Sequence, residues 1–371
     1  MIASNSAYFG VGCFVFVVDK FENISDWFAR IEDALGSIGS IDDLVVSKDV
    51  ESMFGGVLSL VGSDGEVEGC FQPTDGRIQF RINIPRRLHE KLGSWGDVDD
   101  TEAVTEFNVD VRFEYHGPVV FVQSVDAPSS SYPSPSAGVI LVREYLSKEL
   151  EKLAMGVTFQ TIGPSPFHVE FETSVHPKED MPENWPGPMA VIKHPGYDLF
   201  RATFYGDFKI ENALEFTQDF LADELALFYD LTRVVLIRSM KLDLVRGSLE
   251  ELIKFHQNRG VRALFSRVFR TSQRARRLLV DVLESEIEEV RAKQFGEEAI
   301  REQFSATNKS PQFAEKLRDV QELSYLEELR AIRESVSTLD SGRANDFEVF
   351  IISASTILGG IAGAVAALIA S

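Results

Sequence analysis

Residues 77–84 read RIQFRINI, and this short stretch indicates the class of fold. Apolar side chains occupy every second position, with polar ones between them: Ile78, Phe80, Ile82 and Ile84 alternate with Gln79, Arg81 and Asn83. Successive side chains of a β-strand point to opposite faces, so this alternation predicts a strand with one buried and one wet face. The chain around residue 80 is therefore expected to form a sheet.

Further strand patterns surround this stretch on both sides. Hairpin signals, Gly-Ser-Asp-Gly at 62–65 and Thr-Asp-Gly at 74–76, separate it from two preceding apolar runs. The expected strands are Val11–Val18, Val57–Val61, Val67–Gln72, Arg77–Ile84, Phe107–Tyr115, Val119–Val125, Val157–Ile162, His168–Thr173 and Leu199–Tyr205, with helices at 25–35 and 139–153. Residues 1–205 thus predict an α+β soluble domain. The Pro/Ser-rich stretch 127–138 could divide it in two or form a long loop inside it.

A helical pattern replaces the strand pattern from Glu211 onward. The predicted helices are Glu211–Met240, Leu249–Asn258, Val261–Phe269, Gln273–Phe304 and Pro311–Thr338. Residues 211–340 therefore predict a helical region that contains a long antiparallel hairpin.

The end of the sequence is apolar. Val349–Ala370 contains 22 residues without charge or proline. A helix of that length is about 33 Å long, enough to cross a hydrocarbon core of about 30 Å. Residues 344–371 therefore predict a single C-terminal transmembrane helix.

Small residues recur at every fourth position of this segment. They are Ser355, Gly359, Gly363, Ala367 and Ser371. Small-xxx-small faces let membrane helices pack closely, so the pattern predicts a homo-oligomer such as a tetramer, held partly by helix packing in the bilayer. Two alternatives remain open, an inert monomeric anchor and a helix sheltered within the soluble part of the assembly.

Composition and charge narrow the function classes. The net charge of −21 argues against a general nucleic-acid binder. Cys13 and Cys70 lie in apolar runs and are expected to be reduced core residues. No signal peptide is expected, and Arg330, Arg333 and Arg343 precede the tail. This arrangement predicts a single-pass protein of the inner (cytoplasmic) membrane, with its soluble body in the cytoplasm.

A basic island interrupts this acidic sequence. No acidic residue lies between Glu251 and Asp281, whereas Lys254 and seven arginines do, with Phe255, Phe265 and Phe269 among them. Arginine binds phosphate bidentately and aromatic rings stack on bases, so the island predicts a ligand site for a nucleotide or short oligonucleotide. Its candidate ligand-binding residues are Arg259, Arg262, Arg267, Arg270, Arg274, Arg276 and Arg277. The alternatives are structural pairing with Glu284, Glu286, Glu288 and Glu289, and contact with anionic headgroups.

No pattern of catalytic residues stands out. The sequence lacks a G-x-S-x-G motif, a phosphate-binding Walker loop, a dinucleotide fingerprint and a Cys-x-x-Cys pair. His168, Glu170 and Glu172 are expected on one face of a strand, but one histidine with two carboxylates is weak support for a metal site. The sequence therefore predicts neither an enzyme nor a resident metal or cofactor.

The layout of a strand-rich body, a charged helical region, a basic island and a small-residue tail resembles membrane effectors of bacterial anti-phage systems, especially the Hailong-type effector. That resemblance implies a pore- or channel-forming protein regulated by a short single-stranded oligonucleotide or a cyclic nucleotide. A partner nucleotidyltransferase would supply the ligand. The rival hypothesis is a non-catalytic, tail-anchored scaffold or adaptor that binds a protein partner.

Overall fold

The computed structural model describes residues 6–47, 54–61, 67–93, 104–125, 134–162, 169–183, 187–193, 198–257, 271–306, 312–341 and 352. These residues belong to two compact units. Unit 1 comprises residues 1–233 and 299–320, and unit 2 comprises residues 234–298 and 321–371. The sequence pattern placed its boundary between residues 205 and 211.

Unit 1 contains the strands and the shorter helices. In chain order they are β1 (Ser6–Gly12), β2 (Phe14–Val18), α1 (Ile24–Gly36), β3 (Ile41–Val46), β4 (Gly55–Val61), β5 (Val67–Pro73), β6 (Arg77–Asn83), α2 (Arg86–Gly93), β7 (Glu106–Glu114), β8 (Gly117–Ser124), α3 (Pro135–Leu153), β9 (Val157–Thr161), β10 (Val169–His176), the 3-10 turn η2 (Lys178–Asp180), β11 (Met189–Ile192) and β12 (Asp198–Tyr205). Three more helices follow: α4 (Ile210–Gln257), α6 (Thr271–Ala306) and α7 (Ala314–Glu322). Residues 326–341 are also helical.

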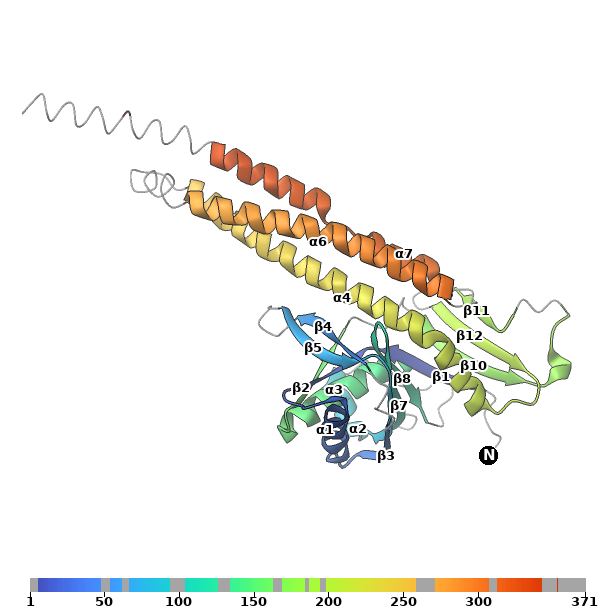
Figure 1. Ribbon diagram of the computed structural model, residues 1–371. Coiled ribbons are helices and arrows are strands. Elements are labelled where there is room, and N and C mark those ends of the chain that lie inside the picture. Colours follow the sequence, from blue (N-terminus) through green and yellow to red (C-terminus); the bar gives the residue numbers. More distant parts are fainter. Residues whose placement is uncertain are drawn as a thin grey trace, which may run out of the picture. The chain divides into compact units, whose positions relative to one another are not determined.

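An eight-stranded sheet forms the centre of unit 1 (Figure 1). Its order is β11-β12-β10-β1-β8-β7-β6-β3, and every pairing is antiparallel except that of β10 with β12. The pairs β2–β9 and β4–β5 form two small additional sheets. The predicted α+β class of this region is therefore what the chain adopts.

Alternate residues of the central strands enter two different cores. On β8, Val120 and Val122 pack with helices α1 and α3, whereas Val119 and Phe121 pack with the first part of α4. Successive side chains of a strand point to opposite faces, so a strand covered on both sides is apolar throughout. This double burial explains why 117–122 is a continuous buried run.

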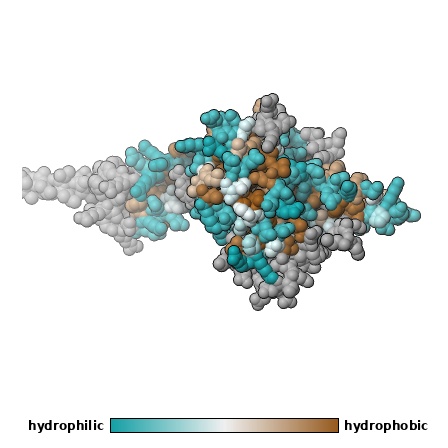
Figure 2. All heavy atoms as spheres, turned by 90° about the horizontal axis from the view of Figure 1, so that it is seen from below, coloured by the Kyte–Doolittle hydropathy of each residue, from teal (hydrophilic) through white to brown (hydrophobic). Residues whose placement is uncertain are grey.

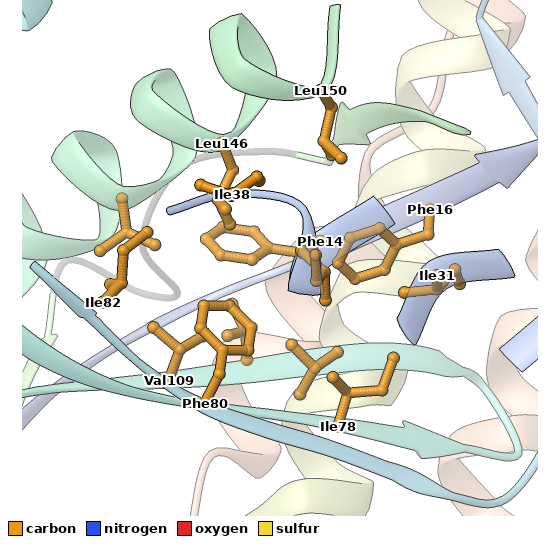
Figure 3. Close-up of a cluster of buried hydrophobic side chains, with 14 of the residues drawn as sticks. Phe14, Phe16, Ile31, Ile38, Ile78, Phe80, Ile82, Val109, Leu146 and Leu150 are labelled. Atoms are coloured by element: carbon orange, nitrogen blue, oxygen red, sulfur yellow. The ribbon is translucent and has the colours of Figure 1, made fainter. Parts of the chain in front are cut away.

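The first core lies beneath α1 and α3. Figure 3 shows Phe14, Ile31, Ile78, Val109 and Leu146, from five different elements, gathered in one cluster. On β1, Gly10 lets α3 come close, because a Cβ at this position would lie only 2.2 Å from the carbonyl oxygen of Pro135. A side chain there would force the helix away from the sheet.

The predicted strand Val11–Val18 is divided in two. β1 ends at Gly12 and belongs to the large sheet, whereas β2 begins at Phe14 and pairs with β9. Cys13, between them, is buried in the second core and, like Cys70, forms no disulfide. The continuous apolar pattern could not show this division, because both strands are buried on both faces.

Unit 2 consists of helical segments that share a narrow aliphatic core. Its buried residues come from the last part of α4, the first part of α6 and the helix at 326–341; they are Leu242, Val245, Leu252, Ala275, Leu278, Val282, Leu329, Ile332 and Val336. The break expected between residues 240 and 249 does not occur, since α4 continues for 48 residues. The single helix expected over 311–338 is interrupted at residues 323–325.

The prediction of a C-terminal transmembrane helix requires correction. None of the helices in the described ranges is long and apolar enough to cross a membrane. The longest two, α4 and α6, carry charged side chains along their length. The fold class is therefore corrected to α+β, with a strand-rich body followed by helices, and the transmembrane element of that prediction is wrong on this finding.

Most of the predicted membrane segment lies outside the described residues. Of residues 344–371 the structure describes only Ile352, and the small residues Ser355, Gly359, Gly363 and Ala367 are all outside. The expected ion channel, membrane association and single-pass inner-membrane location depended on that helix, and they are withdrawn with it.

Candidate phosphate-binding site

Three arginines of the basic island lie in the first two turns of α6. Arg274, Arg276 and Arg277 are all exposed. Lys254 is exposed in the last turn of α4. We call these four residues the basic cluster. The other predicted ligand residues, Arg259, Arg262, Arg267 and Arg270, lie outside the described residues, as does the helix predicted over 261–269.

One arginine of the basic cluster packs on an aromatic ring. The guanidinium of Arg274 lies over the ring of Phe255, 4.5 Å from its centroid. This cation–π contact joins the last turn of α4 to the first turn of α6 and limits the orientations open to the side chain. Phe255 is half-buried, so it belongs to the support of the cluster as well as to its surface.

The alternative of structural pairing requires glutamates of α6 as partners, and most of these glutamates are bonded to other basic residues. Glu286 bonds to Arg333, with 2.7 Å between its Oε2 and Nη1. Glu288 bonds to Lys241 at 2.6 Å, and Glu289 bonds to Arg238 at 3.1 Å. Three of the four proposed acidic partners are therefore already engaged by other bases.

The three arginines form no ion pair with any carboxylate of the described residues. Lys254 has one weak contact, 3.9 Å from Glu250, with both side chains strongly exposed. The segment from 258 to 270 cannot supply the missing charge, because no Asp or Glu occurs between Glu251 and Asp281. The first turn of α6 also lacks an acidic residue, so the positive end of its helix dipole adds to the arginine charge.

A second charged cluster lies in unit 1, and the sequence analysis did not single it out. Arg112 is buried on β7, where it bonds to Asp110 at 2.9 Å and to Asp219 of α4. Arg77 forms a bidentate pair with Asp110, at 2.7 and 2.8 Å, and a further bond to Glu215. The signal was present in Asp110 and Arg112, which are charged but lie in a continuous buried run of β7 between Val109, Val111 and Phe113.

This cluster includes one carboxyl group with a strongly shifted pKa. Burial, followed by the nearby charge of Asp223, raises the pKa of Glu114 to about 8. A carboxyl group that keeps its proton near neutral pH is typical of acid–base sites, but it also occurs in structural networks. Within the described residues no three His, Cys, Asp or Glu side chains form a group that could hold a metal ion. The arginine pairs account for the rest of the cluster, so we assign it a structural role.

The face that suggested a weak metal site also has another explanation. Glu172 accepts hydrogen bonds from the Tyr8 hydroxyl at 2.8 Å and from Nε of Arg201 at 2.6 Å. Tyr8, Glu172 and Arg201 are direct cross-strand neighbours on β1, β10 and β12. His168 lies outside the described residues. Glu172 is therefore the centre of a polar triad across three strands.

Known proteins provide no analogy for this site. No known protein family, curated protein or solved structure matches the chain. Figure 2 shows hydrophilic and hydrophobic residues interspersed over the described surface on one face of the molecule. Arg274, Arg276 and Arg277 thus concentrate positive charge at one end of α6, where no carboxylate of the described residues pairs with them.

Proposed function

We propose that this chain is a non-catalytic binding protein whose unit 2 takes a nucleotide or a short single-stranded oligonucleotide at the basic cluster. The observation that carries the proposal is that Arg274, Arg276 and Arg277 are exposed and pair with no carboxylate of the described residues, in a protein of net charge −21. Uncompensated cations on one helix end repel one another. A bound phosphate relieves that repulsion and accepts charge-assisted hydrogen bonds.

The size and surroundings of the cluster favour a short ligand. Residues 274–277 rise only about 4.5 Å along the helix, which is enough for one or two phosphates. A long duplex would bring its many phosphates against an acidic protein, and that repulsion would offset the gain at the cluster. The ring of Phe255 beside Arg274 offers an apolar contact for a base at the same place.

The ligand gives the protein a regulatory role. The resemblance to nucleotide-regulated anti-phage effectors agrees with a signal molecule made by a partner nucleotidyltransferase. In this proposal the ligand neutralises the end of the helical unit and thereby changes what that unit binds. No catalytic step is assigned to the chain.

The first test is a charge reversal within the cluster. Arg276→Glu with Arg277→Glu should weaken binding of a fluorescein-labelled single-stranded hexadeoxyadenylate by at least about tenfold in an anisotropy titration. The reason is that each lost charge-assisted hydrogen bond contributes about 1.5–3 kcal/mol. Unlabelled ATP as competitor distinguishes a mononucleotide site from one that needs several phosphates.

The control variant makes the same change in net charge elsewhere. Lys20→Glu with Lys209→Glu alters two exposed lysines of unit 1 and should leave affinity for the probe within about twofold, as expected for distant surface charges screened by salt. Equal losses in both variants would reduce the effect to overall charge and overturn the proposal. Absence of probe binding by the unaltered chain would favour the rival hypothesis of an adaptor for a protein partner.

A further inference from the structure

A stripe of apolar side chains lies exposed along the middle of α6. Val280, Leu283, Ile287 and Val290 are 52%, 45%, 51% and 47% exposed. We call these four residues the α6 seam. Their spacings of three, four and three residues place them on one face of the helix over about 15 Å. Single exposed apolar residues are ordinary on protein surfaces, but four in register along a helix are not.

The α6 seam is separate from the core of unit 2. On the same helix, Leu278 and Val282 point into that core and are buried. The seam therefore adds a second apolar face to a helix that already has one. A helix needs only one apolar stripe to pack in its own bundle, so the second stripe has no role within the described residues of unit 2.

We propose that the α6 seam binds the same seam of a second copy of this chain, in parallel, to form a dimer. The spacing is that of coiled-coil a and d positions, with Val280 and Ile287 at a and Leu283 and Val290 at d. β-Branched residues at a with leucine at d favour two parallel strands; Val280, Ile287 and Leu283 follow this preference, whereas Val290 at d does not. The polar residues Arg276 and Gln294 occupy the next positions of this register and end the seam after two heptads.

The charges beside the seam select the parallel orientation. In a parallel pair, Arg291 of the second copy at an e position approaches Glu286 at a g position, which also bonds to Arg333 of its own chain at 2.7 Å. In an antiparallel pair, Glu284 would face Glu284 of the second copy, and Glu286 would face Glu286 of the second copy. Arg277 would face Arg291 of the second copy. Every one of these antiparallel contacts brings like charges together, and like charges across a helix pair are destabilising.

Two heptads suffice because the helix is already formed. A free peptide of this length would have to become helical on binding, whereas α6 is a 36-residue helix whose other face packs in a bundle. The entropy cost of ordering the backbone therefore does not count against dimer formation. The result is a short coiled-coil contact between two prefolded units.

The association test uses sedimentation velocity of the full chain over a micromolar concentration series. The unaltered chain should sediment as a concentration-dependent dimer. Leu283→Gln with Ile287→Gln should raise the dimer dissociation constant by at least about a hundredfold, because two side chains of each copy lose their burial. Both positions are exposed, so the circular dichroism spectrum should stay unchanged, and the melting temperature should match that of the unaltered chain at concentrations where both are monomeric.

A matched control removes apolar surface from another helix. Leu236→Gln with Leu244→Gln alters two exposed leucines of α4, 45% and 65% exposed, and should leave the dimer intact. A monomeric unaltered chain overturns the proposal. Equal dissociation in both double variants overturns the assignment to the α6 seam.

The orientation test uses one introduced cysteine. Val290→Cys places two thiols opposite each other in a parallel dimer, so mild oxidation should give a covalent dimer on a non-reducing gel. The native cysteines, Cys13 and Cys70, are buried, and the unaltered chain serves as the control. A covalent product that forms only when separately prepared Val280→Cys and Val290→Cys chains are mixed would show antiparallel pairing and overturn the parallel arrangement.

Discussion

Unit 1 and unit 2 use their charged residues in opposite ways. In unit 1, Arg77 and Arg112 of the sheet are bound by Asp110 and by carboxylates of α4. In unit 2 one ion pair is buried, while the three arginines of the basic cluster are exposed and pair with no carboxylate of the described residues. The charged groups of this cluster in unit 1 therefore bond to one another within the fold. Unit 2 keeps charged and apolar groups available to other molecules.

The largest expected effect tests the aromatic core of unit 1. Phe171 is fully buried, stacks on Phe9 with centroids 5.2 Å apart and contacts Phe200 and Phe313. Phe171→Ala should lower the free energy of unfolding by about 3–5 kcal/mol, because the change removes a large buried group and leaves a cavity. Guanidinium unfolding followed by circular dichroism measures the loss.

The exposed Phe54 provides the control for that measurement. Phe54 is 79% exposed, so Phe54→Ala should change the free energy of unfolding by no more than about 0.5 kcal/mol. A loss below about 1 kcal/mol for Phe171→Ala would mean that the second core is not close-packed around this ring.

A comparable effect is expected at the buried ion pair of unit 2. Glu289 is 3% exposed and accepts hydrogen bonds from Arg238, from the Ser324 hydroxyl and from the Tyr325 amide. Glu289→Gln should cost about 3–5 kcal/mol, because it leaves the buried Arg238 guanidinium without its counter-charge. Thermal and chemical unfolding of the full chain measure the loss.

Glu288, next in the chain to Glu289, provides the control, because the same substitution there affects a solvent-exposed ion pair. Glu288 pairs with Lys241 at 2.6 Å, but the two side chains are 42% and 37% exposed. Glu288→Gln should therefore cost at most about 1 kcal/mol. Similar losses of unfolding free energy for Glu288→Gln and Glu289→Gln would contradict the conclusion that Glu289 supplies the counter-charge for a buried guanidinium. Arg238→Met with Glu289→Leu should recover most of the loss, because an apolar pair needs no counter-charge.

The smallest expected effect depends on pH and tests unit 1 again. The pKa of Glu114 is raised to about 8, first by burial and then by the charge of Asp223, while the charge of Arg112 opposes the shift. Because the folded state holds this proton more tightly than the unfolded chain, its contribution is complete below the unfolded pKa of about 4.3 and is lost as pH rises through 8. Glu114→Gln carries no charge at any pH, so its melting temperature relative to the unaltered chain should rise between pH 6 and pH 9.

The comparison that checks this pH effect is Glu106→Gln. Glu106 lies at the other end of β7, and its substitution should give a difference in melting temperature that stays constant over the same pH range. A constant difference for Glu114→Gln would show instead that this carboxyl group is already ionised at pH 6.

Local periodicity explains which parts of the fold could be predicted. The alternation at 77–84 identified β6, and the helical pattern over 273–304 identified α6 within two residues at each end. Periodicity gave no boundary where a strand is buried on both faces, because apolar residues then occupy every position. Residues 11–18 are buried on both faces, so nothing in their pattern marked the end of β1 at Gly12. The apolar tail was a further failure, because length and hydropathy fit a membrane helix without establishing one.

The candidate site was likewise predictable from the sequence only in part. The absence of acidic residues between Glu251 and Asp281 was visible in the sequence. The engagement of Glu286, Glu288 and Glu289 by Arg333, Lys241 and Arg238 was not, because those partners lie more than 45 positions away along the chain. Only this long-range pairing shows that Arg274, Arg276 and Arg277 form no ion pair with a described carboxylate.

Local sequence patterns were enough to predict the α+β class, the change from strands to helices near residue 211 and the location of the positive charge. These properties depend on neighbours within a few positions, which a pattern of residues records directly. Three features became evident only in the folded chain: Asp110 bonds to two arginines, α4 continues without a break, and the side chains of the α6 seam are exposed. Each of these depends on which distant segment supplies the contact, and the energy of that contact has no signature in the local pattern.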